Sequence, residues 1–210
     1  MVATHDKSTS AGAPGDWRSF RPLELPAILQ HALDAFAEHG YHGTSVRDIA
    51  RRIGVTVPTI YYHYDNKQDL LVNLLALGID SAIDRVSAAH AEAGNSPADQ
   101  FGSMVEAIVL FEAHRRDLAF LDSEIRSLEP ENRARYVARR DELQQLFVDV
   151  LIAGRRAGIF ATPHPVECSR AILAMCQGVA TWYRPDGPMT PEQIAHQYTR
   201  FAQGAAEQVS

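Results

Sequence analysis

The sequence predicts an all-α protein with a small N-terminal unit of three helices and a larger helical unit behind it. Apolar residues recur at three- and four-residue spacing along almost the whole chain, and no useful stretch alternates apolar and polar residues as a strand does. Glycines and prolines separate the periodic stretches. With 210 residues, of which 46% are hydrophobic and 22% charged, the chain can form two folded units with about nine helices in total.

The N-terminal unit is predicted to contain three helices before residue 67. The first covers residues 26–39, where apolar residues follow the helical period until Gly40. The second covers residues 45–53, because Ser45 and Asp48 have the spacing of a capping box. The third covers residues 57–63, so the second and third helices form a helix-turn-helix.

The rest of the chain predicts longer helices for a second unit. A fourth helix is expected to begin near Asn66, and prolines open several of those that follow. We expect residues 1–20 to form a disordered tail because they are small and polar. The expected domains are then residues 21–67 and 68–210, and the later helices cover Pro97–Arg115, Leu118–Ile125, Pro130–Ala157, Pro165–Tyr183 and Pro191–Glu207.

Charge is distributed unevenly between these units. The formal net charge is −6, yet residues 17–67 carry six Lys or Arg and five Asp or Glu, against thirteen and nineteen in residues 68–210. The smaller unit can therefore present a local basic face to nucleic acid, while the acidic larger unit is held away from phosphates.

The third predicted helix has an inward and an outward face. At 100° per residue, Ile60 and Tyr64 point inward, whereas Pro58, Thr59 and Tyr62 point outward. Small residues on the outer face allow a helix to approach the floor of a major groove. The helix N-terminus at Thr56 favours a phosphate, and tyrosine hydroxyls, a histidine and Lys67 can contact the DNA backbone.

The segment Gly40–Leu71 resembles the DNA-binding unit of TetR-type transcriptional repressors. The match rests on the spacing of Gly40, Thr44, Ser45, Val46, Ile49, Ala50, Gly54, Val55, Thr56, Ile60, Tyr61, His63, Asn66, Lys67 and Leu70. By position, the resemblance implies phosphate contacts for Thr44, Thr56, Tyr61, His63 and Lys67, and base contacts for Arg47, Pro58, Thr59 and Tyr62; Ser45 is included in the same DNA-binding set.

The resemblance also implies a homodimer that binds a palindromic double-stranded operator and responds to a small-molecule effector. The dimer would form through helices 165–183 and 191–207, where Ala171, Ala174, Gly178 and Ala180 allow close approach and Ile194, Tyr198 and Phe201 can fill the seam. The candidate effector-binding residues are apolar, and residues of this kind more often belong to an ordinary core than to a ligand wall: Met104, Phe111, Phe120, Leu121, Phe147, Leu151, Met175 and Trp182.

The segment Ala171–Ala195 resembles the C-terminal part of TetR-type repressors of steroid or fatty-acid catabolism, which respond to acyl-CoA thioesters. A CoA ligand would need cations for its phosphates, and Arg126, Arg155, Arg156, Arg170 and Arg184 are available. Two alternatives stay open. One is a repressor of an efflux pump that responds to a hydrophobic drug-like molecule, and the other is a helical interaction scaffold.

The sequence excludes several other classes. It lacks a G-x-S-x-G, Walker, Rossmann or H-E-x-x-H pattern, so we expect no enzyme activity. His114 and Asp117 lack further ligands, and we expect no metal and no cofactor. The longest apolar-rich run, residues 171–183, is shorter than the roughly 20 residues of a membrane span. Since residues 1–16 also lack signal-peptide features, we expect a cytoplasmic protein without a membrane partner.

Overall fold

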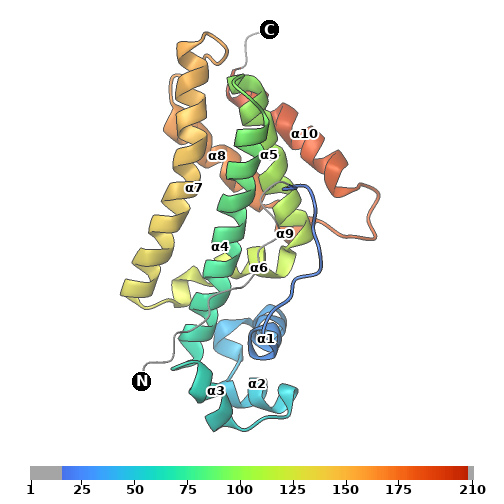
Figure 1. Ribbon diagram of the computed structural model, residues 1–210, viewed down its shortest axis with the longest axis vertical. Helices are drawn as coiled ribbons and strands as arrows, with labels where there is room; N and C mark the ends of the chain where they lie inside the picture. Colours follow the sequence, from blue (N-terminus) through green and yellow to red (C-terminus); the bar gives the residue numbers. More distant parts are fainter. Residues whose placement is uncertain (1–15, 208–210) are drawn as a thin grey trace.

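The computed structural model describes residues 16–207 and contains only helices and connecting loops over that range (Figure 1). This confirms the all-α prediction. The elements are α1 Ala27–Gly43, α2 Val46–Ile53, α3 Val57–His63, α4 Lys67–Glu92, α5 Pro97–His114, α6 Arg116–Phe120, the 3-10 helix η1 Leu121–Ser127, α7 Pro130–Arg156, α8 Pro165–Gln177, α9 Val179–Trp182 and α10 Pro191–Ala205.

The three short helices α1–α3 pack together at one end of the long helix α4 (Figure 1). Ser45 and Asp48 cap α2 with the predicted capping box, and Thr56 and Asn66 cap α3 and α4. The turn between α2 and α3 depends on Gly54, whose φ of 80° lies in the left-handed region that favours glycine.

Helix α4 is continuous from the small unit into the large one. Leu70, Leu74 and Leu75 belong to the core around α1–α3, whereas Ile79 and Val86 belong to the core of the larger unit. The small unit's core therefore extends past the expected boundary at residue 67. Residues of α6 and η1 also close that core, so the two units share a buried junction.

The larger unit is arranged around α5, which packs against α4, α7, α8 and α10. Three phenylalanine rings meet in its core: the ring centroid of Phe101 lies 6.3 Å from that of Phe147 and 5.2 Å from that of Phe160. The helix expected over residues 165–183 divides at Gly178 into α8 and the short α9. No helix in residues 16–207 combines the length and apolarity needed to cross a bilayer.

The expectation of a disordered tail over residues 1–20 is wrong for its last five positions, while residues 1–15 lie outside the described part. Trp17 is buried, 3% exposed, and its Nε1 donates to Glu92 at 2.9 Å. Arg18 forms ion pairs with Glu92 and Glu106. Burial of one large aromatic side chain offsets the entropy of ordering this short segment, which overall polarity does not reveal.

Residues 17–20 of this segment also contact side chains of α4 and α5. The Nη1 of Arg85 donates to the Trp17 carbonyl at 2.6 Å, and the Phe20 ring stacks on His114 at 4.3 Å. We call residues 16–20 the N-terminal strap. It ties the chain that precedes α1 to α4 and α5 of the larger unit (Figure 1).

Candidate DNA interface and effector cavity

The exposed surface of α2 and α3 agrees with the faces predicted for the helix-turn-helix. Ile60 is 1% exposed and anchors α3 in the core, while Tyr61 and Tyr62 are 50% and 85% exposed. The hydroxyls of Thr56 and Thr59 lie 2.8 Å apart at the start of α3. Eight of the predicted DNA-contacting residues are exposed here: Ser45, Arg47, Thr56, Pro58, Thr59, Tyr61, Tyr62 and His63.

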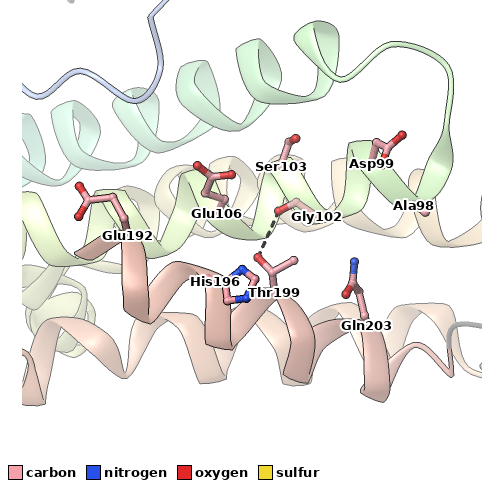
Figure 2. Close-up of a pocket in the computed structure, with 9 residues that line it drawn as sticks. All are labelled: Ala98, Asp99, Gly102, Ser103, Glu106, Glu192, His196, Thr199 and Gln203. Atoms are coloured by element: carbon pink, nitrogen blue, oxygen red, sulfur yellow. Dashed lines mark hydrogen bonds between the residues drawn. The ribbon is translucent and has the colours of Figure 1, made fainter. Parts of the chain in front are cut away.

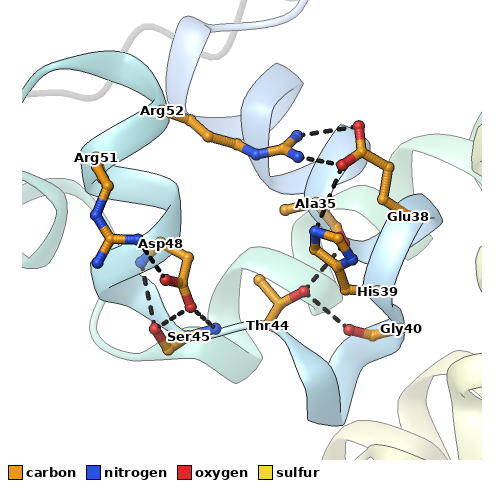
Figure 3. A network of polar contacts seen from close by, with 9 residues as sticks. All are labelled: Ala35, Glu38, His39, Gly40, Thr44, Ser45, Asp48, Arg51 and Arg52. Carbon is orange, nitrogen blue, oxygen red and sulfur yellow. Dashed lines mark hydrogen bonds and ion pairs between the residues drawn. The ribbon is translucent and has the colours of Figure 1, made fainter.

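The arginines of α2 differ in their availability. Arg51 pairs with Asp48 at 3.0 Å, and Arg52 pairs with Glu38 of α1 (Figure 3). Arg47 is exposed and makes no ion pair within residues 16–207. Arg47 is therefore the α2 arginine that is free to contact a base edge.

The resemblance implies that Thr44 contacts a phosphate, but the structure does not place its hydroxyl to do so. Thr44 is 3% exposed, and its Oγ1 lies 3.0 Å from the Ala35 carbonyl oxygen and 2.9 Å from that of Gly40 (Figure 3). The hydroxyl thus satisfies the backbone where α1 ends. This contact depends on the kink of α1 at Gly40, the residue at which the sequence predicts the end of the first helix.

Lys67 also has a different position from the one expected. Its Nζ donates to the carbonyl oxygens of Tyr41 and Thr44 at 2.7 Å and 2.9 Å, and lies 4.0 Å from the centre of the Tyr41 ring. Burial lowers the pKa of this amine. Lys67 begins α4, where a cation is unfavourable, but its side chain folds back onto the C-terminal end of α1, where a cation is favourable.

The same end of α1 is bound by η1 of the larger unit. Glu124 Oε1 accepts a hydrogen bond from the Tyr41 amide at 3.0 Å, and Glu124 Oε2 accepts one from Ser127 at 3.1 Å. Gly40 has a φ of 70°, and a Cβ there would lie 3.2 Å from the same Glu124 oxygen. The positive φ favours glycine at the kink, and a Cβ there would also require the Glu124 carboxylate to shift slightly.

A cavity of about 40 Å³ lies in the larger unit between α4, α5, α7 and the segment formed by α6 and η1. Its apolar wall includes Ile79, Ile108, Phe111 and Leu143. Its polar wall consists of Glu112, Asp122, Tyr136, Arg140 and Gln177.

The polar residues of the cavity are only partly paired. The Tyr136 hydroxyl donates to Asp122 at 2.9 Å, and the Arg140 Nε lies 3.7 Å from the same oxygen. Burial raises the pKa of the Tyr136 phenol, which therefore stays a donor. Glu112 is 5% exposed and makes no hydrogen bond or ion pair within residues 16–207. Burial, and then the charge of Asp122, raises the pKa of Glu112 well above its usual range.

Of the predicted effector-binding residues, only Phe111 lines this cavity. Helical periodicity identifies inward-facing residues but not which of them border a void. Glu112 was missed, although a carboxylate inside the apolar stretch Ala107–Ala113 of α5 is a usable signal. Among the others, Met104, Phe147 and Leu151 are buried in the main core, Leu121 is buried in the small unit's core, Met175 is half-buried, and Phe120 and Trp182 are 43% and 44% exposed.

A second hollow is an open groove of about 350 Å³ between α5 and α10 (Figure 2). Asp99, Glu106 and Glu192 give it an acidic lining. Glu106 already pairs with Arg18 of the strap. An open, acidic groove suits neither an apolar effector nor the phosphates of a CoA ligand.

The end of the chain carries an exposed aromatic surface. The ring centroid of Tyr198 lies 6.4 Å from that of Trp182 and 6.1 Å from that of Phe201. Phe201 is 60% exposed. We call these three residues the aromatic ladder. Of the other residues expected in a dimer seam, Ala171 and Ala174 are exposed, Gly178 is half-buried, and Ala180 and Ile194 are buried within the subunit.

Two family profiles match the chain. Residues 28–74 match the one described as bacterial regulatory proteins of the tetR family, and residues 94–205 match the tetracyclin repressor-like C-terminal domain. The chain belongs to the TetR family. It is a helix-turn-helix DNA-binding regulator of the ligand-responsive repressor type, as the sequence predicts.

The relatives agree with this TetR-family assignment. The transcriptional repressor KstR2 of Rhodococcus jostii is 28% identical over 88% of this chain and 92% of its own. The structure of KstR2 from Mycobacterium tuberculosis, a ketosteroid transcriptional regulator, has a TM-score of 0.77 at 25% identity, covering 87% of this chain and 94% of that one. AibR, solved with isovaleryl coenzyme A and operator DNA, shares the fold with a TM-score of 0.76 at 24% identity, covering 83% and 95%.

Proposed function

We propose that this TetR-family protein is a dimeric repressor that binds a palindromic operator through α3 and is released by a small apolar effector. The outward face of α3 carries this proposal. There the small residues Pro58 and Thr59 lie beside the exposed Tyr62, while Ile60 holds the helix in the core. A small-residue face on a fixed helix suits contact with the major groove.

A shift assay with genomic DNA fragments at increasing salt concentration tests DNA binding. A repressor that neutralises phosphates loses affinity steeply as salt rises. Absence of retarded fragments at low salt would instead support the helical interaction scaffold.

We further propose that the effector is an acyl-CoA thioester of lipid or steroid catabolism. The resemblance to KstR2 and the fold shared with AibR support this class. The arginines expected to serve the CoA phosphates are exposed, and Arg140 borders the cavity itself. Mass spectrometry of small molecules that co-purify with the native protein tests the proposal. A CoA-thioester mass supports it, while a hydrophobic drug-like mass would favour the efflux-pump alternative.

The contacts of α3 lead to a prediction about sequence preference. Replacing Thr59 with alanine is expected to change which base is preferred at one position in each half-site, by roughly 1–3 kcal/mol. Replacing Tyr61 with phenylalanine removes a proposed phosphate contact, so it should weaken binding to all sequences alike. Binding of both variants to a randomised operator library measures this difference. Equal loss on operator and random DNA for the Thr59 variant would contradict its assignment to a base edge.

The segment formed by α6 and η1 connects the cavity to the DNA-binding unit. Leu118 and Asp122 line the cavity, Leu121 is buried in the small unit's core, and Glu124 binds the end of α1. We propose that an effector that widens the cavity moves this segment and thereby shifts α1 and the helices packed on it.

Replacing Glu124 with alanine is therefore expected to separate effector binding from DNA release. Allosteric coupling typically changes affinity by about 5- to 150-fold, and the coupling to DNA affinity should fall several-fold in this variant, because the Tyr41 amide loses its acceptor. Replacement by glutamine keeps an acceptor oxygen and serves as the matched control. DNA affinity with and without the co-purified effector measures the coupling. Unchanged coupling in the alanine variant would show that η1 does not transmit the signal.

A further inference from the structure

Among the described residues that line the cavity, one carboxyl group has no protein partner. Glu112 lies on α5 between Phe111 and Ala113, which are buried, and it faces the void together with apolar side chains. Its carboxyl group borders the cavity, and no side chain or backbone group of residues 16–207 bonds to it. The carboxyl is therefore available to whatever occupies the void.

The groups around Glu112 disfavour its ionised form. From α6 and η1 it faces Asp122, and from α7 it faces Tyr136 and Arg140, which are both engaged with Asp122. From α8 it faces Cys176, whose thiol pKa is raised by burial and by Glu112. The residues that α4 contributes to the wall carry no charge. The nearby cation is thus paired with Asp122, and no cation within residues 16–207 pairs with Glu112.

We propose that Glu112 is the polar recognition group of this cavity and that it hydrogen-bonds an uncharged oxygen, a carbonyl or a hydroxyl, at the buried end of an apolar effector. A neutral carboxyl offers one donor and an acceptor, which match such an oxygen. A ligand ammonium would require an ionised Glu112 beside the carboxylate of Asp122 and would lie near Arg140. This inference rests on the proposed function, in which this cavity receives the effector.

The size of the cavity sets the choice of probes. A volume of about 40 Å³ holds only a few water molecules, so an effector must widen it. Small probes with one carbon skeleton therefore test the chemistry best. Ethylbenzene is the hydrocarbon, acetophenone adds a carbonyl oxygen, and 1-phenylethylamine adds an ammonium group.

Binding of the three probes to the full-length protein can be measured by ligand-observed NMR at a pH at which the carboxyl carbon of labelled Glu112 shows it to be protonated. One hydrogen bond of about 1 kcal/mol predicts that the wild type binds acetophenone roughly fivefold more tightly than ethylbenzene. Glu112→Gln keeps a donor and should retain this preference, whereas Glu112→Leu should lose it. A wild type that binds the amine more tightly than the ketone, that binds no probe, or whose preference survives in Glu112→Leu would overturn the proposal.

A pH series provides a second readout that needs no variant. The carbonyl preference should be present below the pKa of Glu112 and should fall as the pH rises through it, because the ionised carboxylate no longer donates. The carboxyl carbon of labelled Glu112 reports the same titration directly. A preference that does not vary with pH while Glu112 titrates would overturn the proposal.

DNA-shift assays on the same samples keep the two proposals distinct. If Glu112→Leu binds operator DNA as the wild type does, a lost carbonyl preference concerns the cavity alone. If the wild type binds no DNA while the probe results hold, the repressor function fails and the assignment of Glu112 stands.

Discussion

Replacing Lys67 with alanine is expected to lower the free energy of unfolding by about 2 kcal/mol, within the range for hydrogen bonds to a charged group. The loss arises because the Tyr41 and Thr44 carbonyl oxygens lose their donor and the Tyr41 ring loses its cation. DNA binding should weaken to a similar degree for all sequences, because α2 follows directly from the end of α1. Denaturant unfolding and the shift assay measure the two effects.

The salt dependence of DNA binding separates this structural role from a phosphate contact. A lysine that neutralises one phosphate contributes about 0.9 to the slope of log affinity against log salt, and its removal reduces the slope by that amount. Lys67→Ala should leave the slope unchanged while lowering stability. Arg47→Ala is the matched control for the stability measurement, since Arg47 is exposed and unpaired among the described residues. This variant should leave the free energy of unfolding unchanged. A reduced slope with unchanged stability for Lys67→Ala would restore the phosphate assignment.

Replacing Phe201 with aspartate is expected to convert a dimer into monomers. Phe201 ends the aromatic ladder and is 60% exposed in the single chain, so it is available to a partner subunit. A carboxylate buried at the centre of such a seam costs several kcal/mol unless it is paired. A monomer contacts only one half-site, and losing the second contact lowers operator affinity by about 10²- to 10⁴-fold. Light scattering and the shift assay measure both losses.

Val137→Asp is the control for this substitution. Val137 is an exposed apolar residue of α7, 37% exposed, and it lies outside the proposed seam. That variant should remain dimeric and bind DNA as the wild type does. If Phe201→Asp also remains dimeric, the aromatic ladder is not the subunit interface.

The faces of the helix-turn-helix could be predicted from sequence because they depend on local rules. The helical period places Ile60 inward and Tyr62 outward, and the capping spacing of Ser45 and Asp48 fixes the start of α2. Gly54 ends α2 for a reason that involves only its own backbone. Each of these features involves residues within a few positions of one another.

The features that could not be predicted depend on contacts between distant residues. Lys67 contacts Tyr41, Trp17 contacts Glu92, and Glu124 contacts the Tyr41 amide. A lysine or a tryptophan has the same local pattern whether its partner is solvent, DNA or a distant carbonyl. The cavity could not be predicted for a related reason, since a void is defined by where several helices fail to fill space.

The N-terminal strap has a practical consequence for optical studies of this regulator. The chain has two tryptophans, and the structure places them in different surroundings: Trp17 is buried against α4 and α5, whereas Trp182 is 44% exposed on the aromatic ladder. Their indole emission will therefore differ in wavelength and in accessibility to quenchers. The native protein thus carries two tryptophan fluorophores, one that reports release of the strap and one that lies on the surface proposed as the subunit interface.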